Sequence, residues 1–291
     1  MTVRVVTDST ADLPQDIVTE LGITVVPLHI HFGEETYEDG VTITNDEFYR
    51  RLTTGSILPK TSAPAAGTFT EAYERLAAET DEIISIHISS KLSATYTSAL
   101  LGKEDIKAAC SVEVIDSYSA SIGLGLLAIR AARQARAAAT LGAIAADIAA
   151  AVPRTKYFGV VDTLEYLHKG GRIGMATALL GSLLKVKPIV GLRDGVTHPI
   201  ERVRGDRQKA FDRLCEMVSS YGSISSLAIA HTTAEEEMER LAARLAQFFP
   251  SDRIVKSRCG ATLGTYLGPN TLCVAIIRED LDSNPADCGK K

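Results

Sequence analysis

Neutral hydroxyl side chains are the groups in this sequence with the clearest capacity for chemistry. They cluster directly after short apolar runs, in Asp8-Ser9-Thr10, Thr61-Ser62, Ser89 through Ser93, and Asp116-Ser117. Hydroxyls can hold a carboxylate by hydrogen bonds, and a serine with a base beside it can act as a nucleophile. Serine and threonine also cap helix N-termini, so these segments by themselves favour ligand binding and capping about equally.

Other motifs give weaker signals. Gly123-Leu124-Gly125 lacks the third glycine of a dinucleotide-binding fingerprint, and neither a Walker A nor a GxSxG sequence occurs. His29 and His31 share a strand face near Glu34, but no third ligand has a fitting spacing, so we expect no metal site. Gly170-Gly171-Arg172 could cradle an anion, although a turn that ends a helix explains the glycines equally well.

A basic cluster in the second half can be read in two ways. Its members are Arg193, Arg202, Arg204 and Arg207. Such a cluster is usually a solvated face. It could also dock an acidic partner, for which Arg202 and Arg204 are the candidates.

Composition and length predict an ordinary globular protein of two domains. The chain has 291 residues, and about 150 residues make a typical domain. Apolar residues make up 45% and charged residues 23%, and a net charge of −5 gives no reason to expect a nucleic-acid partner. The five cysteines form no CxxC pair, which excludes a zinc ribbon and a thioredoxin-like motif.

The apolar segments predict a cytoplasmic protein. The first ten residues read as a strand that enters a loop and not as a signal peptide. The most apolar stretches, residues 123–132 and 135–152, are interrupted by charges and fall short of the ~20 apolar residues of a membrane span. We therefore expect reduced cysteines and no integral membrane contact.

Strand and helix patterns alternate along the first half. Apolar runs at residues 3–7, 23–32, 82–88 and 112–115 predict strands, and helical patterns lie between them. This alternation is typical of a parallel sheet with helices on both faces. In such sheets ligands bind at the carboxyl ends of the strands, where the hydroxyl-rich segments lie.

The second half predicts a different sheet. Asp194-Gly195 between two apolar runs is a strong hairpin signal, and hairpins mixed with helices favour a partly antiparallel sheet. The predicted fold class is therefore α/β, with a domain boundary near Pro153. A Rossmann-like parallel-sheet domain spans residues 1–155, an α/β domain with a mixed or antiparallel sheet spans residues 156–281, and residues 282–291 form a polar tail.

Several segments, in this order, resemble the DegV family of bacterial fatty-acid-binding proteins. They are VTDSTADLP at residues 6–14, KTSAP at 60–64, ISSKLSATY at 88–96, VIDS at 114–117, SASIGLG at 119–125, DTLEYLHKGGRI at 162–173, KPI at 187–189, GTY at 264–266 and GP at 268–269. Each segment alone is weak. Their number and order make the resemblance specific, and they span nearly the whole chain.

The resemblance implies one fatty acid, such as palmitate, stearate or oleate, bound between two α/β domains without a cofactor. It places the carboxylate on the hydroxyls of Thr61 and Ser93. The neighbours expected at the head group are Ser62, Ser117, Arg172 and Tyr266. It also implies a separate fatty acid kinase, which phosphorylates the bound acyl group to an acyl phosphate for phospholipid synthesis.

Three positions depart from the family pattern. The family often has glycine at Ala94 and at Asn270, and often has histidine at Tyr266. A tyrosine can still donate a hydrogen bond, but it is neutral at pH 7. Two other functions stay open. A hydrolase or acyltransferase would use Ser93 as nucleophile and would need a base such as His87. A regulatory protein would use the basic cluster to bind a partner in response to lipid.

Overall fold

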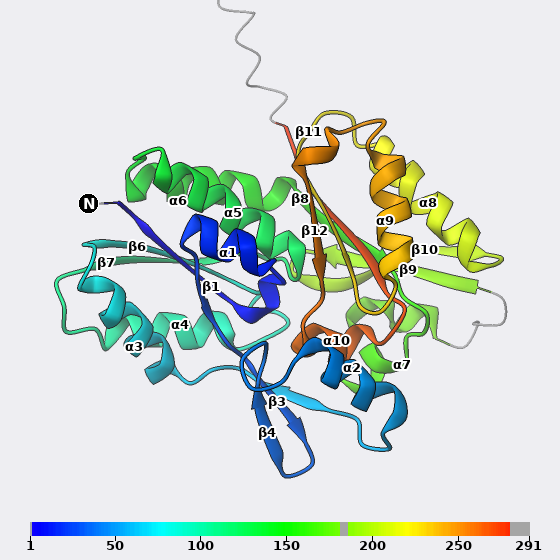
Figure 1. The fold of residues 1–291 in the computed structure, drawn as a ribbon, viewed down its shortest axis with the longest axis horizontal. Helices are drawn as coiled ribbons and strands as arrows, with labels where there is room; N and C mark the ends of the chain where they lie inside the picture. The colour runs from blue at the N-terminus through cyan, green and yellow to red at the C-terminus, as the bar shows by residue number, and fades with distance from the viewer. Residues whose placement is uncertain (1, 181–185, 280–291) are drawn as a thin grey trace, which may run out of the picture.

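A four-stranded parallel sheet forms the first half of the molecule (Figure 1). The computed structural model describes residues 2–180 and 186–279. The strand order is β2-β1-β6-β7, and all three pairings are parallel. The strands are β1 (Arg4–Asp8), β2 (Thr24–Val26), β6 (Glu82–His87) and β7 (Ser111–Asp116). The buried valines and isoleucines of β1 and β6 fit a sheet that is covered on both faces.

Helices cover both faces of this sheet. α3 (Ala66–Ala77) and α4 (Thr95–Glu104) pack on one face around Phe69 and Tyr73. α5 (Ile122–Arg136) and α6 (Leu141–Ala151) pack on the other face, and α1 (Gln15–Leu21) lies beside α5. The predicted Rossmann-like parallel sheet is confirmed.

A six-stranded mixed sheet forms the second half. Its order is β10-β9-β8-β13-β11-β12, and only β11 and β12 are parallel. The predicted hairpin at Asp194-Gly195 joins β9 to β10, and both turn residues have positive φ, at 51° and 77°. The strands are β8 (Thr155–Val160), β9 (Val186–Arg193), β10 (Val196–Arg204), β11 (Ile224–His231), β12 (Ile254–Arg258) and β13 (Leu272–Arg278). α8 (Arg207–Ser219) and α9 (Glu235–Leu245) cover one face of this sheet.

A third sheet departs from the sequence prediction. β3 (His29–Phe32) pairs with β4 (Glu35–Glu38) on one side and with β5 (Lys60–Ser62) on the other, and α2 (Asn45–Thr54) lies beside it. The single strand expected over residues 23–32 is two strands, because Pro27 cannot donate a ladder hydrogen bond. β4 and β5 lie outside the strands that the sequence predicted.

Shorter helices complete the second half. α7 (Glu165–Lys169) and α10 (Ala261–Leu267) pack against each other, and α10 also contacts α2 and β5. A 3-10 helix (Gly174–Leu179) also belongs to this half. The tail predicted over residues 282–291 lies outside the described residues.

α5 joins the two large sheets. Eleven of its fifteen residues are buried, and it packs against β1 and β6 of the first sheet and against β8, β11 and β13 of the second. A Cβ at Gly125 would lie 2.6 Å from the carbonyl oxygen of Ala11, so close helix packing explains the Gly123-Leu124-Gly125 motif. One apolar core therefore runs through both halves. The domain division after residue 155 stays a prediction.

Candidate ligand-binding site

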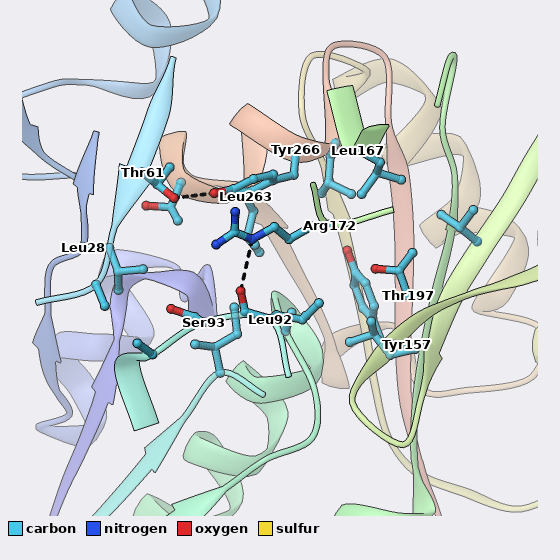
Figure 2. Close-up of a pocket in the computed structure, with 18 of the residues that line it drawn as sticks. Leu28, Thr61, Leu92, Ser93, Tyr157, Leu167, Arg172, Thr197, Leu263 and Tyr266 are labelled. Carbon is cyan, nitrogen blue, oxygen red and sulfur yellow. Dashed lines mark hydrogen bonds between the residues drawn. The ribbon is translucent and has the colours of Figure 1, made fainter. Parts of the chain in front are cut away.

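A cavity of about 200 Å³ is lined by residues from both halves of the chain (Figure 2). Eleven of the twenty lining residues are aliphatic: Leu28, Ala63, Ile88, Leu92, Ala94, Ala120, Leu167, Val190, Leu192, Leu263 and Leu267. Thr61, Ser93, Arg172 and Tyr266 also line it. Figure 2 shows these four on one side, and Tyr157 and Thr197 on the other. The cavity thus has a polar side and a largely apolar interior.

Thr61 and Tyr266 meet across the cavity. Thr61 lies in the middle of β5, where it pairs with Ile30 of β3, and this pairing sets the direction of its side chain. Tyr266 lies in the last turn of α10. The hydroxyl oxygens of the two residues are 2.6 Å apart, in a hydrogen bond that spans 205 residues of sequence. Each hydroxyl therefore has a partner that a bound carboxylate could replace.

Arg172 brings positive charge to the same side. Its guanidinium carbon lies 5.1 Å from the centroid of the Tyr266 ring, a cation–π distance. Its Nε and Nη1 donate to the carbonyl oxygens of Leu92 and Gly170, at 3.2 and 3.0 Å. A Cβ on Gly170 would collide with the Tyr266 ring. The Gly170-Gly171-Arg172 turn therefore leaves room for the Tyr266 ring and places the exposed Arg172 guanidinium beside it.

Ser93 has a local role as well as a place in the lining. Its Oγ lies 2.8 Å from Oγ1 of Thr95 and 3.3 Å from the Thr95 amide nitrogen, which donates to it. The Ser93 hydroxyl thus supports the first turn of α4 in the manner of a cap. The sequence left binding and capping open, and the structure gives Ser93 a position that allows both.

The other predicted head-group neighbours are placed differently. Ser62 lines the cavity, but its Oγ lies 2.9 Å from Nε2 of His31. Ser117 is buried away from the lining, and its Oγ donates to the carbonyl oxygen of Ser119 at 3.2 Å. The structure therefore gives no support to Ser117 as a head-group neighbour.

The histidines considered for a metal or for catalysis have other partners. His31 lies between the hydroxyls of Thr36 and Ser62. The described part of the chain holds no group of three or more side chains able to bind a metal. His87 is fully buried between Asp8 and Ser85, at 2.9 and 2.7 Å. Both ring nitrogens of His87 and the Ser93 hydroxyl thus have other partners, and the structure gives no support to His87 as a base for Ser93.

Two buried carboxylates, which we call the acidic pair, went unrecognised in the sequence. Asp39 accepts the amide hydrogens of Ala261 and Thr262, at 2.9 and 3.2 Å, and Asp12 accepts that of Gly260 at 2.7 Å. These are amides at the start of α10, which carries Tyr266. Burial raises the pKa of both carboxyls, that of Asp12 to about 7. The acidic pair therefore joins the first half to the helix of the head-group site.

The comparisons with known proteins agree with this architecture. A family model described as "uncharacterised protein, DegV family" matches residues 2–279. Protein DegV of Bacillus subtilis is 33% identical over 276 residues, which are 94% of this chain and 98% of that protein. No helix among the described residues has the length and apolar character to cross a membrane.

Two solved structures share the fold. A DegV family protein from Thermus thermophilus, described by its fatty acid binding, has a TM-score of 0.88 and 31% identity, covering 96% of this chain and all of that one. DegV of Bacillus subtilis, described as a fatty acid binding protein, has a TM-score of 0.87 and 32% identity with the same coverage. The parallel sheet, the mixed sheet and the match over residues 2–279 lead to one conclusion: this chain belongs to the DegV family.

Proposed function

We propose that the cavity binds one long-chain fatty acid, such as palmitate, stearate or oleate. Thr61 and Ser93 hold the carboxylate, and Arg172 and Tyr266 lie beside it. The observation that carries this proposal is the division of one cavity into a polar side and an aliphatic interior, in a chain similar to two fatty acid binding proteins. The aliphatic residues then surround the acyl tail.

The tail supplies most of the affinity in this proposal. Burying a methylene contributes about 0.8 kcal/mol, so a tail of about 16 carbons contributes on the order of 11 kcal/mol before entropy costs. Hydrogen bonds to a charged carboxylate contribute roughly 1.5–3 kcal/mol each. The carboxylate replaces the Thr61–Tyr266 hydrogen bond, because both hydroxyls can turn to donate to it. The head group therefore sets orientation and disfavours alcohols and esters.

We further propose that the protein carries the fatty acid in the cytoplasm and presents it to a separate fatty acid kinase. The exposure of Arg172 supports this proposal, because a carboxylate held beside it would lie near the surface. The acyl phosphate formed there would enter phospholipid synthesis. Arg202 and Arg204 are exposed on β10 and are candidates for kinase docking. No cofactor and no nucleic acid take part.

Removing either carboxylate-binding hydroxyl is expected to weaken fatty-acid binding. Thr61→Val keeps the shape of the side chain and removes its donor, and Ser93→Ala does the same at the second contact. Each change should raise the Kd for palmitate by roughly 10- to 100-fold, the loss of one hydrogen bond to a charged group. Displacement of a fluorescent fatty-acid analogue by palmitate measures this change.

A matched control is available in the same cavity. Thr197 lines the side opposite the head group, so Thr197→Val removes a hydroxyl without touching the carboxylate contacts. We expect its Kd to stay within about threefold of the wild-type value, a difference below 1 kcal/mol. Equal effects of Thr61→Val and Thr197→Val would refute the assignment of the head group to Thr61.

Charge reversal on β10 tests the kinase partnership separately. The double variant Arg202→Glu, Arg204→Glu should reduce acyl-phosphate formation by a kinase catalytic subunit and ATP at least about tenfold, because like charges at an interface are costly. Palmitate binding should not change, since neither residue lines the cavity. Unchanged acyl-phosphate formation would exclude docking through these arginines and leave fatty-acid binding unaffected.

A further inference from the structure

A second cavity lies directly beside the first. It has a volume of about 590 Å³, and two residues, Tyr157 and Leu192, line both cavities. Phe158 and Ile200 line only the second cavity. The two spaces therefore share a wall, which we call the partition.

The course of β9 creates this second space. β9 pairs with β8 only from Phe158 to Val160, while the preceding residues of β8 pair with β13 alone. The β9–β10 hairpin leaves β8 there and reaches the first half, where Ser89 Oγ donates to the carbonyl oxygen of Gly195 at 2.9 Å. The second cavity is lined by β8 and by this departing hairpin.

The partition is anchored by a buried hydrogen bond. Tyr157 is buried, and its hydroxyl donates to Sγ of Cys273 at 3.1 Å. Gly191 lines the first cavity beside it, and a Cβ there would lie 2.5 Å from Cδ1 of Ile200 and 3.1 Å from Cβ of Phe158. Tyr157 and Gly191 therefore lie where the aliphatic lining of the first cavity comes closest to Phe158 and Ile200 of the second.

The two cavities differ in character. The second is lined by the basic side chains Lys156 and Arg193, the imidazole of His198 and the carboxylate of Asp194, and these polar groups make it suited to water and ions. Burial and the nearby guanidinium groups lower the pKa of Lys156. An acyl chain would lose part of its hydrophobic gain if its end entered this space as it stands. The partition keeps the aliphatic cavity apart from this charged, polar cavity.

We propose that Tyr157 is a specificity-determining residue, whose ring limits the length of the acyl chain that the protein retains. This inference rests on the proposed fatty-acid function. Tyr157 lies on the side of the cavity opposite Thr61 and Ser93, where the methyl end of a bound chain must lie (Figure 2). Removing the ring joins the two cavities past Leu192, Ile200 and Phe158, so that a longer chain fits.

Tyr157→Ala is the direct test. Protein purified from cells, and separately protein loaded from an equimolar mixture of saturated fatty acids of about 14 to 22 carbons, is extracted and the bound chains are quantified by mass spectrometry. The preferred chain should lengthen by about two to four carbons, in proportion to the volume of the removed ring. Leu192→Ala, at the other shared position, should shift the preference in the same direction by a smaller amount.

Three control variants and one rescue variant distinguish the role of the partition from a general loss of structure. Tyr157→Phe keeps the ring and should leave the chain-length profile unchanged. Leu263→Ala enlarges the first cavity away from the partition, and Tyr221→Ala enlarges only the second, so neither should favour longer chains. Adding Ile200→Trp to Tyr157→Ala should refill the opening and restore the shorter preference.

The outcomes distinguish the two proposals. Wild-type protein that takes up no fatty acid from the mixture refutes the proposed function itself. Wild-type protein that takes up fatty acid while Tyr157→Ala and Leu192→Ala keep its profile refutes the partition alone. If Tyr157→Ala does not fold, Leu192→Ala and Tyr157→Leu decide the question with smaller losses of buried volume.

Discussion

Replacing Asp8 by alanine is expected to lower the free energy of unfolding by about 3–5 kcal/mol, because each buried donor left without its acceptor costs roughly 1–3 kcal/mol. Asp8 and His87 are both fully buried, and Nδ1 of His87 lies 2.9 Å from Oδ2 of Asp8. The same carboxylate accepts the amide hydrogens of Thr10 and Ile88, each at 3.0 Å. Alanine leaves all of these donors without an acceptor.

The Asp8→Ala substitution should also weaken palmitate binding. Ile88 lines the cavity directly after β6, and its amide is held by Asp8. Urea unfolding gives the stability change, and palmitate binding measured well below the unfolding transition gives the functional change. Asp46→Ala is the control, because Asp46 forms an exposed ion pair with Arg258 that contributes at most about 1 kcal/mol. Losses of equal size in the two variants would contradict the role given to Asp8.

The buried Asp8–His87 pair shows what the sequence could and could not predict. The apolar runs before Asp8 and before His87 predicted parallel strands correctly, since strands covered on both faces leave a continuous hydrophobic signal. Their pairing as neighbours in the sheet brings the two side chains together, and no local pattern encodes that pairing. The hydroxyl-rich segment at residues 8–10 therefore predicted the strand end but not its buried hydrogen-bond network.

The sequence predicted which residues belong to the head-group site, but it did not predict the strand and the helix that bring them together. Thr61 and Tyr266 were named from a family resemblance, yet the strand that carries Thr61 has only three residues and was not among the predicted strands. α10 went unrecognised because glycines stand before it, within it and after it, which lowers helix propensity. Both elements are stabilised by contacts with distant residues, Ile30 for β5 and the acidic pair for α10.

Replacing Asp12 by asparagine is expected to stabilise the protein at pH 8 and to change little at pH 4. Burial raises the pKa of Asp12 from 3.8 to about 7. A raised pKa in the folded state means that the stability contributed by the bound proton is complete below about 3.8 and is lost as the pH rises through about 7. The difference between the two pKa values corresponds to about 4 kcal/mol.

The asparagine can keep the local hydrogen bonds. Its Oδ1 can accept the Gly260 amide, and its amino group can donate to Ser121 Oγ, which in the wild type donates to Asp12 at 2.6 Å. Urea unfolding at pH 5, 6, 7 and 8 should therefore show a gap between variant and wild type that widens by about 3 kcal/mol across this range. Asp39, whose pKa burial also raises, leaves some pH dependence in the variant.

An exposed carboxylate supplies the control for this pH series. Asp46→Asn makes the same change in charge at a side chain that is 87% exposed, and its gap to the wild type should stay constant from pH 5 to 8. A constant gap for Asp12→Asn as well would show that the Asp12 carboxyl does not gain a proton on folding. The acidic pair would then join the two halves as a permanently charged contact.

Native mass spectrometry of the protein as purified tests most directly whether the cavity between the halves binds a fatty acid. The prediction is a mass excess of one long-chain fatty acid per chain, identified by extraction, and retained less by Thr61→Val and Ser93→Ala than by the wild type. A chain that carries no fatty acid, and that takes up none when palmitate is added, would contradict it.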